Sequence, residues 1–193
     1  MARTESTMAV LGMTAPSFAL PDTEGRIVSV ESFVGATGLL VMFLCNHCPF
    51  VKHLRLELAN FIRKYQKRGL AVVGINSNDV TTHPADSPEM MSRETEEAGY
   101  TFSYLFDEDQ SVAKAYTAAC TPDFFLFDRA SLLVYRGQFD GSRPGNDVMV
   151  TGADLGAAVE ALLEGGSIST DQLPSVGCNI KWKPGNEPGY FPR

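Results

Sequence analysis

The sequence predicts an α/β fold in which helices flank a central mixed β-sheet, and two patterns support this prediction. The first is a strand-helix-strand unit: residues 39–44 and 70–75 are continuous apolar runs, and residues 51–65 between them place apolar side chains three and four positions apart. That order predicts a right-handed parallel crossover. The second is a pair of strands, 124–127 and 132–135, whose short polar connection predicts an antiparallel hairpin.

The remaining elements are predicted from turn and capping residues. Residues 15–30 hold two short apolar stretches separated by turn residues, which indicates an N-terminal hairpin. Residues 102–106 are a candidate for a short strand. Three further helices are expected from the residues that open them: 88–98 after Ser87, a brief helix through Tyr116 capped by Asp109, and a helix opened by a Thr151-Asp154 capping box and closed by Gly165.

Composition and charge limit the class of protein. A chain of 193 residues with 44% hydrophobic residues suffices for a single domain, 1–193, with a core at about 12–165 and an extended tail, 166–193, that is rich in Pro and Gly. The formal net charge of -7 argues against nucleic-acid and anionic-membrane partners. The first residues lack a basic region followed by an apolar run, so we expect neither a secretory signal nor a membrane span, and the predicted location is cytoplasmic.

Cys45 and Cys48 form a C-x-x-C motif where the first predicted strand leads into the first predicted helix. Four cysteines are too few for a disulfide scaffold, so this motif indicates redox chemistry or a metal. Because Pro49 is expected to be the first helical residue, the unpaired amides of Phe50 and Val51 should point at the Cys48 sulfur. Such settings lower a cysteine pKa from about 8.5 to roughly 3.5–7.5. Cys48 is therefore the predicted nucleophile, and Cys45 is near enough to pair with it.

Two other features bear on these thiols. His47, inside the motif, either tunes a thiol or is a solvated loop residue. Pro122 precedes a predicted strand, and it is either an ordinary trans proline or a cis proline whose loop lies opposite the helix end. In the second case the Thr121 backbone is free to pair with an extended substrate segment, and Cys120 lies near Cys48.

Several segments together resemble the thioredoxin-like superfamily, and within it the peroxiredoxin-like branch of alkyl hydroperoxide reductases and thiol-specific antioxidant proteins. The resemblance covers roughly residues 12–165 and is carried by APSFALPDTEG, the strand before CNHC, GINSND and TPDFFLFD. The segments CNHCPFVKH and PSVGCNIKWKPGN resemble those of a set of bacterial proteins in the same branch. The resemblance implies a thioredoxin fold in which Thr121-Pro122 is the cis-proline loop that faces the thiols.

The resemblance leaves two registers for the motif. Phe43 precedes Cys48 by five residues, the spacing that precedes the first active-site cysteine of thioredoxins, and this favours Cys48 as that cysteine. In the other register Cys45 and Cys48 are the usual pair, and the loop is three residues shorter. The peroxiredoxin pattern P-x-x-x-[TS]-x-x-C is absent, because Val41 and Cys45 stand where proline and threonine are needed.

Two redox functions are compatible with these residues. The first is a thiol-disulfide oxidoreductase in which Cys48 attacks a substrate disulfide and a second thiol resolves the mixed disulfide. The second is a thiol peroxidase in which Cys48 passes through a sulfenic acid. The resolving or accessory thiol is open among three candidates, Cys45, Cys120 and Cys178.

A third function, of another class, is a metal or ligand-binding module that uses Cys45 and Cys48 with His47 or His53. Zinc sites usually need four ligands and the other cysteines are far away in the sequence, so no metal and no cofactor is predicted. The expected partners are a protein or small-molecule disulfide or peroxide as substrate and a thiol reductant system. The oligomeric state is left open.

Overall fold

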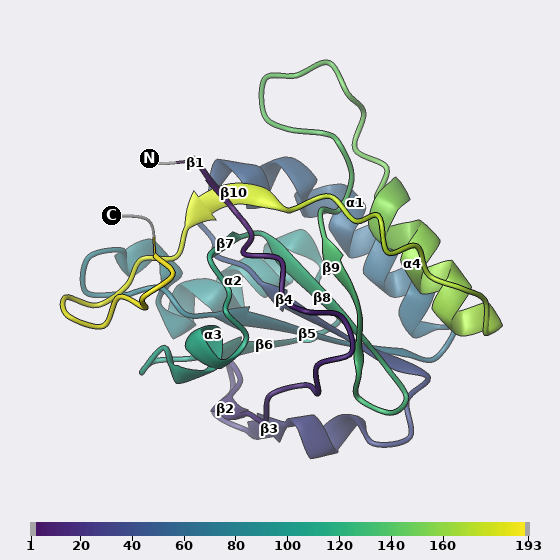
Figure 1. Cartoon of the computed structure of the whole chain (residues 1–193). Helices are drawn as coiled ribbons and strands as arrows, with labels where there is room; N and C mark the ends of the chain where they lie inside the picture. The colour runs from purple at the N-terminus through teal and green to yellow at the C-terminus, as the bar shows by residue number, and fades with distance from the viewer. Residues whose placement is uncertain (1–2, 192–193) are drawn as a thin grey trace.

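The computed structural model of the protein describes residues 3–191, and its centre is a five-stranded mixed sheet (Figure 1). The strand order is β6-β5-β4-β8-β9. The two pairs β4/β5 and β5/β6 are parallel, while β4/β8 and β8/β9 are antiparallel, which confirms the predicted crossover and hairpin. The strands are β4 (Gly38–Phe43), β5 (Leu70–Asn76), β6 (Ser103–Phe106), β8 (Asp123–Asp128) and β9 (Leu133–Gly137).

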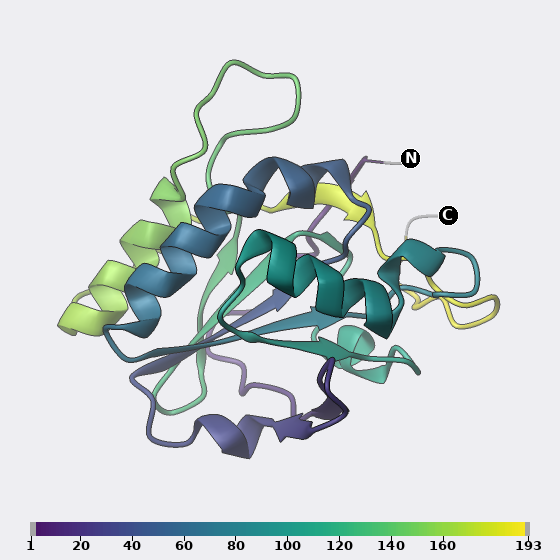
Figure 2. The ribbon, with the colours of Figure 1, turned by 180° about the vertical axis from the view of Figure 1, so that it is seen from behind.

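Helices cover both faces of this sheet. One face packs against α1 (Pro49–Gln66), α2 (Pro88–Ala98) and α4 (Ala153–Glu164), and Figure 2 shows α1 and α2 in front of the strands. The other face packs against α3 (Ser111–Ala115) and against the predicted N-terminal hairpin, formed by β2 (Ala19–Pro21) and β3 (Ile27–Ser29). Two 3₁₀ turns, Val30–Phe33 and Pro84–Asp86, complete the regular elements of this part. No helix within 3–191 is both long and apolar enough to cross a membrane.

The central strand β4 is buried along its whole length. Leu40 and Met42 contribute to the core under α1, α2 and α4, while Val41 and Phe43 contribute to the core on the opposite face. Successive side chains of a strand point to opposite faces, so a strand covered on both sides must be apolar at every position. This explains the uninterrupted apolar run in the sequence.

Two predicted helix caps are wrong in detail. The capping box at Thr151 is not formed, because α4 has Gly152 as its N-cap and the carboxylate of Asp140 accepts the backbone amides of Thr151 and Gly152, each at 2.6 Å. The N-cap of α3 is Gln110, in the left-handed region at φ 64°, and Asp109 instead accepts the amide of the first helical residue. In both cases a side chain from outside the N-cap position satisfies the exposed amides.

A second, smaller sheet brings the two ends of the chain together beside the first turn of α1. Its order is β1-β10-β7, and both pairs are antiparallel. The strands are β1 (Arg3–Glu5), β10 (Val176–Asn179) and β7 (Cys120–Thr121). Figure 1 shows β10, in yellow, beside the N-terminal strand. After β10, Ile180 and Trp182 are buried in the core on the α3 side, so the extended tail folds back onto the sheet.

A buried ion pair joins β9 to the start of β8. The guanidinium of Arg136 lies 3.0 Å from the Asp123 carboxylate, and both side chains are fully buried. Arg136 also donates to the hydroxyl and the carbonyl of Thr117 and lies over the ring of Phe125. Removing one member of such a pair leaves an unpaired buried charge.

We expect Arg136→Met to lower the free energy of unfolding by about 3–5 kcal/mol, since the Asp123 carboxylate loses its counter-charge in a dry environment. Urea denaturation measures this loss. Adding Asp123→Asn to the same chain should recover part of it, because no buried charge remains. The matched control is Arg93→Met, which breaks an exposed pair with Glu89 and should change stability by less than about 1 kcal/mol. A double variant less stable than the single one contradicts the expectation.

Candidate active site

Cys48 is the N-cap of α1, immediately before Pro49 at the first helical position, as the sequence predicts. The strand β4 ends at Phe43, and a short loop delivers Cys48 to the helix end. The backbone amide of Val51, in the first turn of α1, lowers the pKa of Cys48, although the Cys48 side chain makes no capping hydrogen bond to the helix. Unpaired amides and the positive end of the helix dipole converge at this position and favour a thiolate. The side chain is fully buried, at 0% exposure.

The Thr121-Pro122 peptide bond is cis, and its loop faces the two motif cysteines. The Cys48 sulfur lies 3.2 Å from the Thr121 carbonyl oxygen. The Cys45 sulfur lies 3.2 Å from the Thr121 hydroxyl. The structure therefore confirms the predicted cis-proline loop and shows in addition that Thr121 contacts both thiols.

Three thiols meet at this point. Hydrogen bonds from the Cys178 and Cys45 thiols lower the pKa of Cys48 well below the ordinary cysteine value, against the opposing effect of burial. The amides of Val51 and Cys178 act in the same direction. The hydrogen bond to Cys48 and burial raise the pKa of Cys45 and of Cys178. These shifts favour loss of the proton from Cys48 before Cys45 or Cys178. While protonated, the Cys48 thiol donates to the Thr121 carbonyl oxygen at 3.2 Å.

Cys120 lies in the same region but points elsewhere. Its thiol is 3.6 Å from the Pro122 carbonyl oxygen and 4.0 Å from the Ser175 carbonyl oxygen. Burial raises the pKa of Cys120, so it stays protonated. Of the three predicted candidates for the second thiol, the structure brings Cys45 and Cys178 to Thr121 beside Cys48 and directs the Cys120 thiol at backbone carbonyls.

The expectation that the Thr121 backbone is free for a substrate is wrong. Strand β10 already pairs with it, and Cys178 stands opposite Thr121 in the antiparallel register. The approach is very close: a Cβ atom on Gly177 would lie 1.9 Å from the Thr121 carbonyl oxygen. A glycine next to a cysteine in the tail segment PSVGCNIKWKPGN is the signal in the sequence that marks this contact.

Asp86 holds the loop between the two motif cysteines and was not predicted. Its buried carboxylate accepts the amides of Asn46 and His47 at 2.8 and 3.3 Å, the His47 Nδ1 at 2.6 Å, and the Asn78 side chain at 2.8 Å. Burial alone raises the pKa of Asp86, but the bonds from His47 and Asn78 outweigh it and the net pKa is lowered. His47 is therefore a fixed residue, paired with Asp86 and stacked on His83 at 4.9 Å.

The side chains around Asp86 also determine whether a metal ion can bind at this place. Ligand atoms of Cys45, His47 and Asp86 lie within 4.8 Å of one another. Structural zinc sites use four ligands, and both Asp86 oxygens already accept hydrogen bonds from the loop and from Asn78. His53, a candidate ligand from the sequence, lies away from the thiols, with its ring 2.7 Å from the Ser142 hydroxyl. This set of side chains positions the motif loop.

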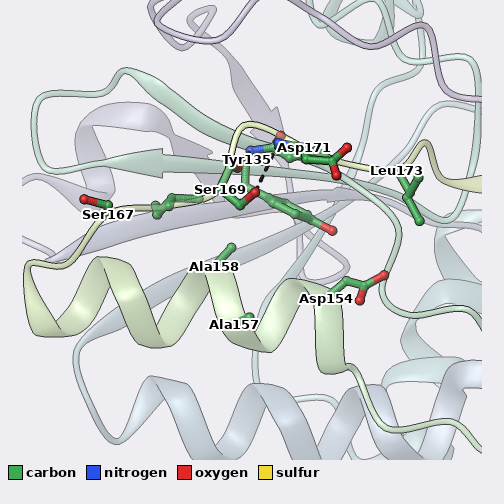
Figure 3. Close-up of a pocket in the computed structure, with 10 residues that line it drawn as sticks. Tyr135, Asp154, Ala157, Ala158, Ser167, Ser169, Asp171 and Leu173 are labelled. Atoms are coloured by element: carbon green, nitrogen blue, oxygen red, sulfur yellow. Dashed lines mark hydrogen bonds between the residues drawn. The ribbon is translucent and has the colours of Figure 1, made fainter.

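Two cavities help to locate the site. One of about 420 Å³, drawn in Figure 3, lies between Tyr135, α4 and the tail at 167–173, and no cysteine lines it. Another of about 470 Å³ lies between the motif loop, α1 and α2, and it is lined in part by Asn46 and His47. The second cavity therefore adjoins the residues that separate the two motif cysteines.

A central strand that delivers a cysteine to a helix N-terminus, faced by a cis-proline loop, defines a thioredoxin-like thiol-dependent oxidoreductase. More narrowly, the chain belongs to the AhpC/TSA family, whose model matches residues 11–136. The family membership and the fold confirm the resemblance found in the sequence.

Individual relatives fall into both redox classes. The chain is 27% identical over 126 residues to the thiol-disulfide oxidoreductase ResA of Geobacillus thermodenitrificans, covering 65% of this chain and 68% of the relative. It is 30% identical over 105 residues to peroxiredoxin Bcp of Escherichia coli, and the match covers 54% of this chain and 62% of the relative. A crystal structure of a hypothetical protein from Sinorhizobium meliloti is similar over 94% of this chain and all of that one, with 53% identity and a TM-score of 0.93. The relatives imply a redox substrate and a reductant as partners.

We expect the Cys48 thiolate of the reduced protein to persist as the pH falls, because its pKa is lowered. The absorbance of thiolate near 240 nm, measured against Cys48→Ser, should still differ by one thiolate at about pH 6, well below the ordinary cysteine pKa of about 8.5. Cys120→Ser is the matched control, and it should leave the titration unchanged. A difference that disappears with a midpoint near that ordinary value contradicts the assignment.

Proposed function

We propose that the protein exchanges thiols and disulfides through Cys48, with Cys45 as the resolving thiol. The observation that carries this proposal is the position of both sulfurs at Thr121: the Cys45 sulfur lies 3.2 Å from its hydroxyl, and the Cys48 sulfur, at the N-terminus of α1, lies 3.2 Å from its carbonyl oxygen. The helix end stabilises the attacking thiolate, and the resolving thiol is already next to it.

The reaction runs in two exchanges. The Cys48 thiolate attacks one sulfur of an external disulfide, a Cys48–substrate bond forms, and the other substrate sulfur leaves as a thiolate that takes up a proton. Cys45 then gives up its proton and attacks the Cys48 sulfur, which forms the Cys45–Cys48 disulfide and releases the second substrate thiol. The substrate gains two electrons and two protons, and an external thiol reductant later returns the protein to the dithiol.

Thr121 acts as a positioning residue in the second exchange. Its hydroxyl lies 3.2 Å from the Cys45 sulfur, and this hydrogen bond lowers the pKa of Cys45 against the larger opposing effects of the Cys48 contact and burial. The carbonyl of the same residue lies beside the Cys48 sulfur. Thr121 therefore keeps the two sulfurs of the pair in one place. Asp86 does the same for the loop that connects them.

A thiol peroxidase is the second candidate function, and one observation favours it. Cys48 is fully buried and β10 occupies the Thr121 edge, so a peroxide reaches the thiolate with less displacement of protein than a protein disulfide needs. The Cys48 thiolate attacks the peroxide O–O bond, which gives a sulfenic acid and a hydroxide or alkoxide. The Cys45 thiol then condenses with the sulfenic acid to give the disulfide and water.

We expect Cys48→Ser to lower disulfide-reduction activity by at least about 100-fold, since it removes the nucleophile. The assay is turnover of insulin and of glutathione disulfide by the reduced protein, with a chemical thiol as reductant. The double variant Cys45→Ser/Cys178→Ser, which lacks both neighbouring thiols, should form the first mixed disulfide and fail to release it, so intact-mass spectrometry finds the substrate half attached to Cys48.

The same variants separate the two functions. Hydrogen peroxide consumption with the same thiol reductant is measured beside disulfide reduction. Faster turnover of peroxide than of both disulfides assigns the peroxidase function, and the reverse assigns the oxidoreductase. Full activity of Cys48→Ser toward all three substrates overturns both, since each begins with this thiolate.

A further inference from the structure

The C-terminal strand β10 occupies the place where an extended peptide substrate pairs with the cis-proline loop. It lies between β1 and β7, and its register sets Cys178 opposite Thr121 and Asn179 opposite Cys120. Addition of an extended segment to a free strand edge is a general mode of peptide recognition. Here a segment of the same chain fills that edge, and it carries a cysteine.

We propose that β10 is a built-in substrate strand whose Cys178 replaces Cys45 as the disulfide partner of Cys48. The oxidised protein then carries either a Cys45–Cys48 or a Cys48–Cys178 disulfide. This inference rests on the proposed role of Cys48 as nucleophile. It makes Cys178 a further catalytic residue of the same reaction.

Thr121 places both candidate partners, Cys45 and Cys178, beside the Cys48 sulfur. The Thr121 carbonyl lies 3.2 Å from the Cys48 sulfur, and its hydroxyl lies 3.2 Å from the Cys45 sulfur. Cys178 pairs with this same residue and donates a hydrogen bond to Cys48. All three cysteines are at most 1% exposed, and they belong to one packed cluster under α1. Either bond forms with only a small movement of sulfurs that already lie around one residue, Thr121.

Gly177 permits this contact. A Cβ at position 177 would lie 1.9 Å from the oxygen and 2.6 Å from the carbon of the Thr121 carbonyl group. Any side chain there must push β10 away from β7, and Cys178 moves with it. The free edge of β7 therefore accepts only an extended segment in which glycine precedes the cysteine. An external peptide that displaces β10 must also have glycine at that position.

The exchange needs no external oxidant. In the Cys45–Cys48 form, Cys178 gives up its proton and attacks the Cys48 sulfur; the Cys48–Cys178 bond forms, the Cys45–Cys48 bond breaks, and Cys45 takes up the proton. One disulfide and one thiol are present before and after. The step moves the disulfide from the motif loop to the tail strand and leaves Cys45 as a thiol.

Hydrogen bonds attach the chain to the rest of the fold on both sides of β10. After it, the Lys181 amide donates to the Asn78 side chain at 2.8 Å, the Asp79 amide donates to the Lys181 carbonyl at 2.8 Å, and Trp182 is buried in the core. Before it, the segment 167–173 lines the cavity of Figure 3 and is mostly exposed, but the Gln172 side chain accepts the Arg136 amide and the Leu173 carbonyl accepts the Gln138 amide, each at 2.9 Å. Truncation of the tail removes core residues, so point substitutions are the appropriate test.

The test is a disulfide map of the full chain. Wild type, Cys45→Ser, Cys178→Ser and Gly177→Val are equilibrated in a glutathione redox buffer, quenched with acid, alkylated and mapped by mass spectrometry. We expect both disulfides in wild type, only Cys48–Cys178 in Cys45→Ser, and only Cys45–Cys48 in the other two. Asn179→Ala is the matched control on the same strand, and it should give the wild-type map.

Each outcome bears on the proposal. A Cys45→Ser protein that holds glutathione on Cys48 and never forms Cys48–Cys178 overturns it, even where wild type forms the Cys45–Cys48 disulfide and is active. A Gly177→Val protein that keeps Cys48–Cys178 at the wild-type level overturns the role of the close approach. Circular dichroism checks that Gly177→Val is folded, and Gly177→Ala, with a smaller but still obstructed side chain, should reduce the same disulfide. Loss of every disulfide at Cys48 in wild type overturns the proposed function itself.

Discussion

The stabilisation of a charged sulfur inside the protein is the interaction on which the rest of the site depends. A buried ionised group is costly unless hydrogen bonds replace the water that it loses. At Cys48 the neighbouring Cys178 and Cys45 thiols lower the pKa against burial, and so do the backbone amides of Val51 and Cys178. These groups belong to two distant parts of the chain, the segment 45–51 and strand β10. The tail must therefore fold back over the helix end for the thiolate to be stable there.

A buried carboxylate provides a second, supporting constraint. Asp86 follows β5 in the chain and fixes the motif loop that follows β4, and the two strands are parallel neighbours. Loops at the carboxyl ends of adjacent parallel strands meet at one edge of a sheet, where sites are usually built. Through His47 the carboxylate also orients a ring, and its charge raises the pKa of Cys45 in addition to the Cys48 contact and burial. This leaves the negative charge of the motif on Cys48.

Local patterns in the sequence were enough for the sheet and for the helix end. The apolar run of β4, the spacing of α1 and the proline after Cys48 each encode their own structure within a few residues. The β10–β7 pairing and the His47–Asp86 pair depend on contacts between distant residues. A four-residue strand has too little periodicity to reveal its partner. The glycine before Cys178 and the polar stretch after β5 are the features of the sequence that correspond to these contacts.

The low pKa of Cys48 also determines where electrons enter the oxidised protein. In thiol-disulfide exchange the sulfur with the lower pKa is the better leaving group. Both proposed disulfides share Cys48, and its thiolate is the one that the site stabilises. An incoming thiol therefore attacks the Cys45 or the Cys178 sulfur, and Cys48 departs as the thiolate that begins the next cycle. Of these two sulfurs, Cys178 lies on a strand near the chain ends, while Cys45 lies in the loop held by Asp86. When the disulfide moves onto β10, the sulfur that the reductant attacks is therefore that of Cys178 in the tail instead of that of Cys45 in the fixed loop.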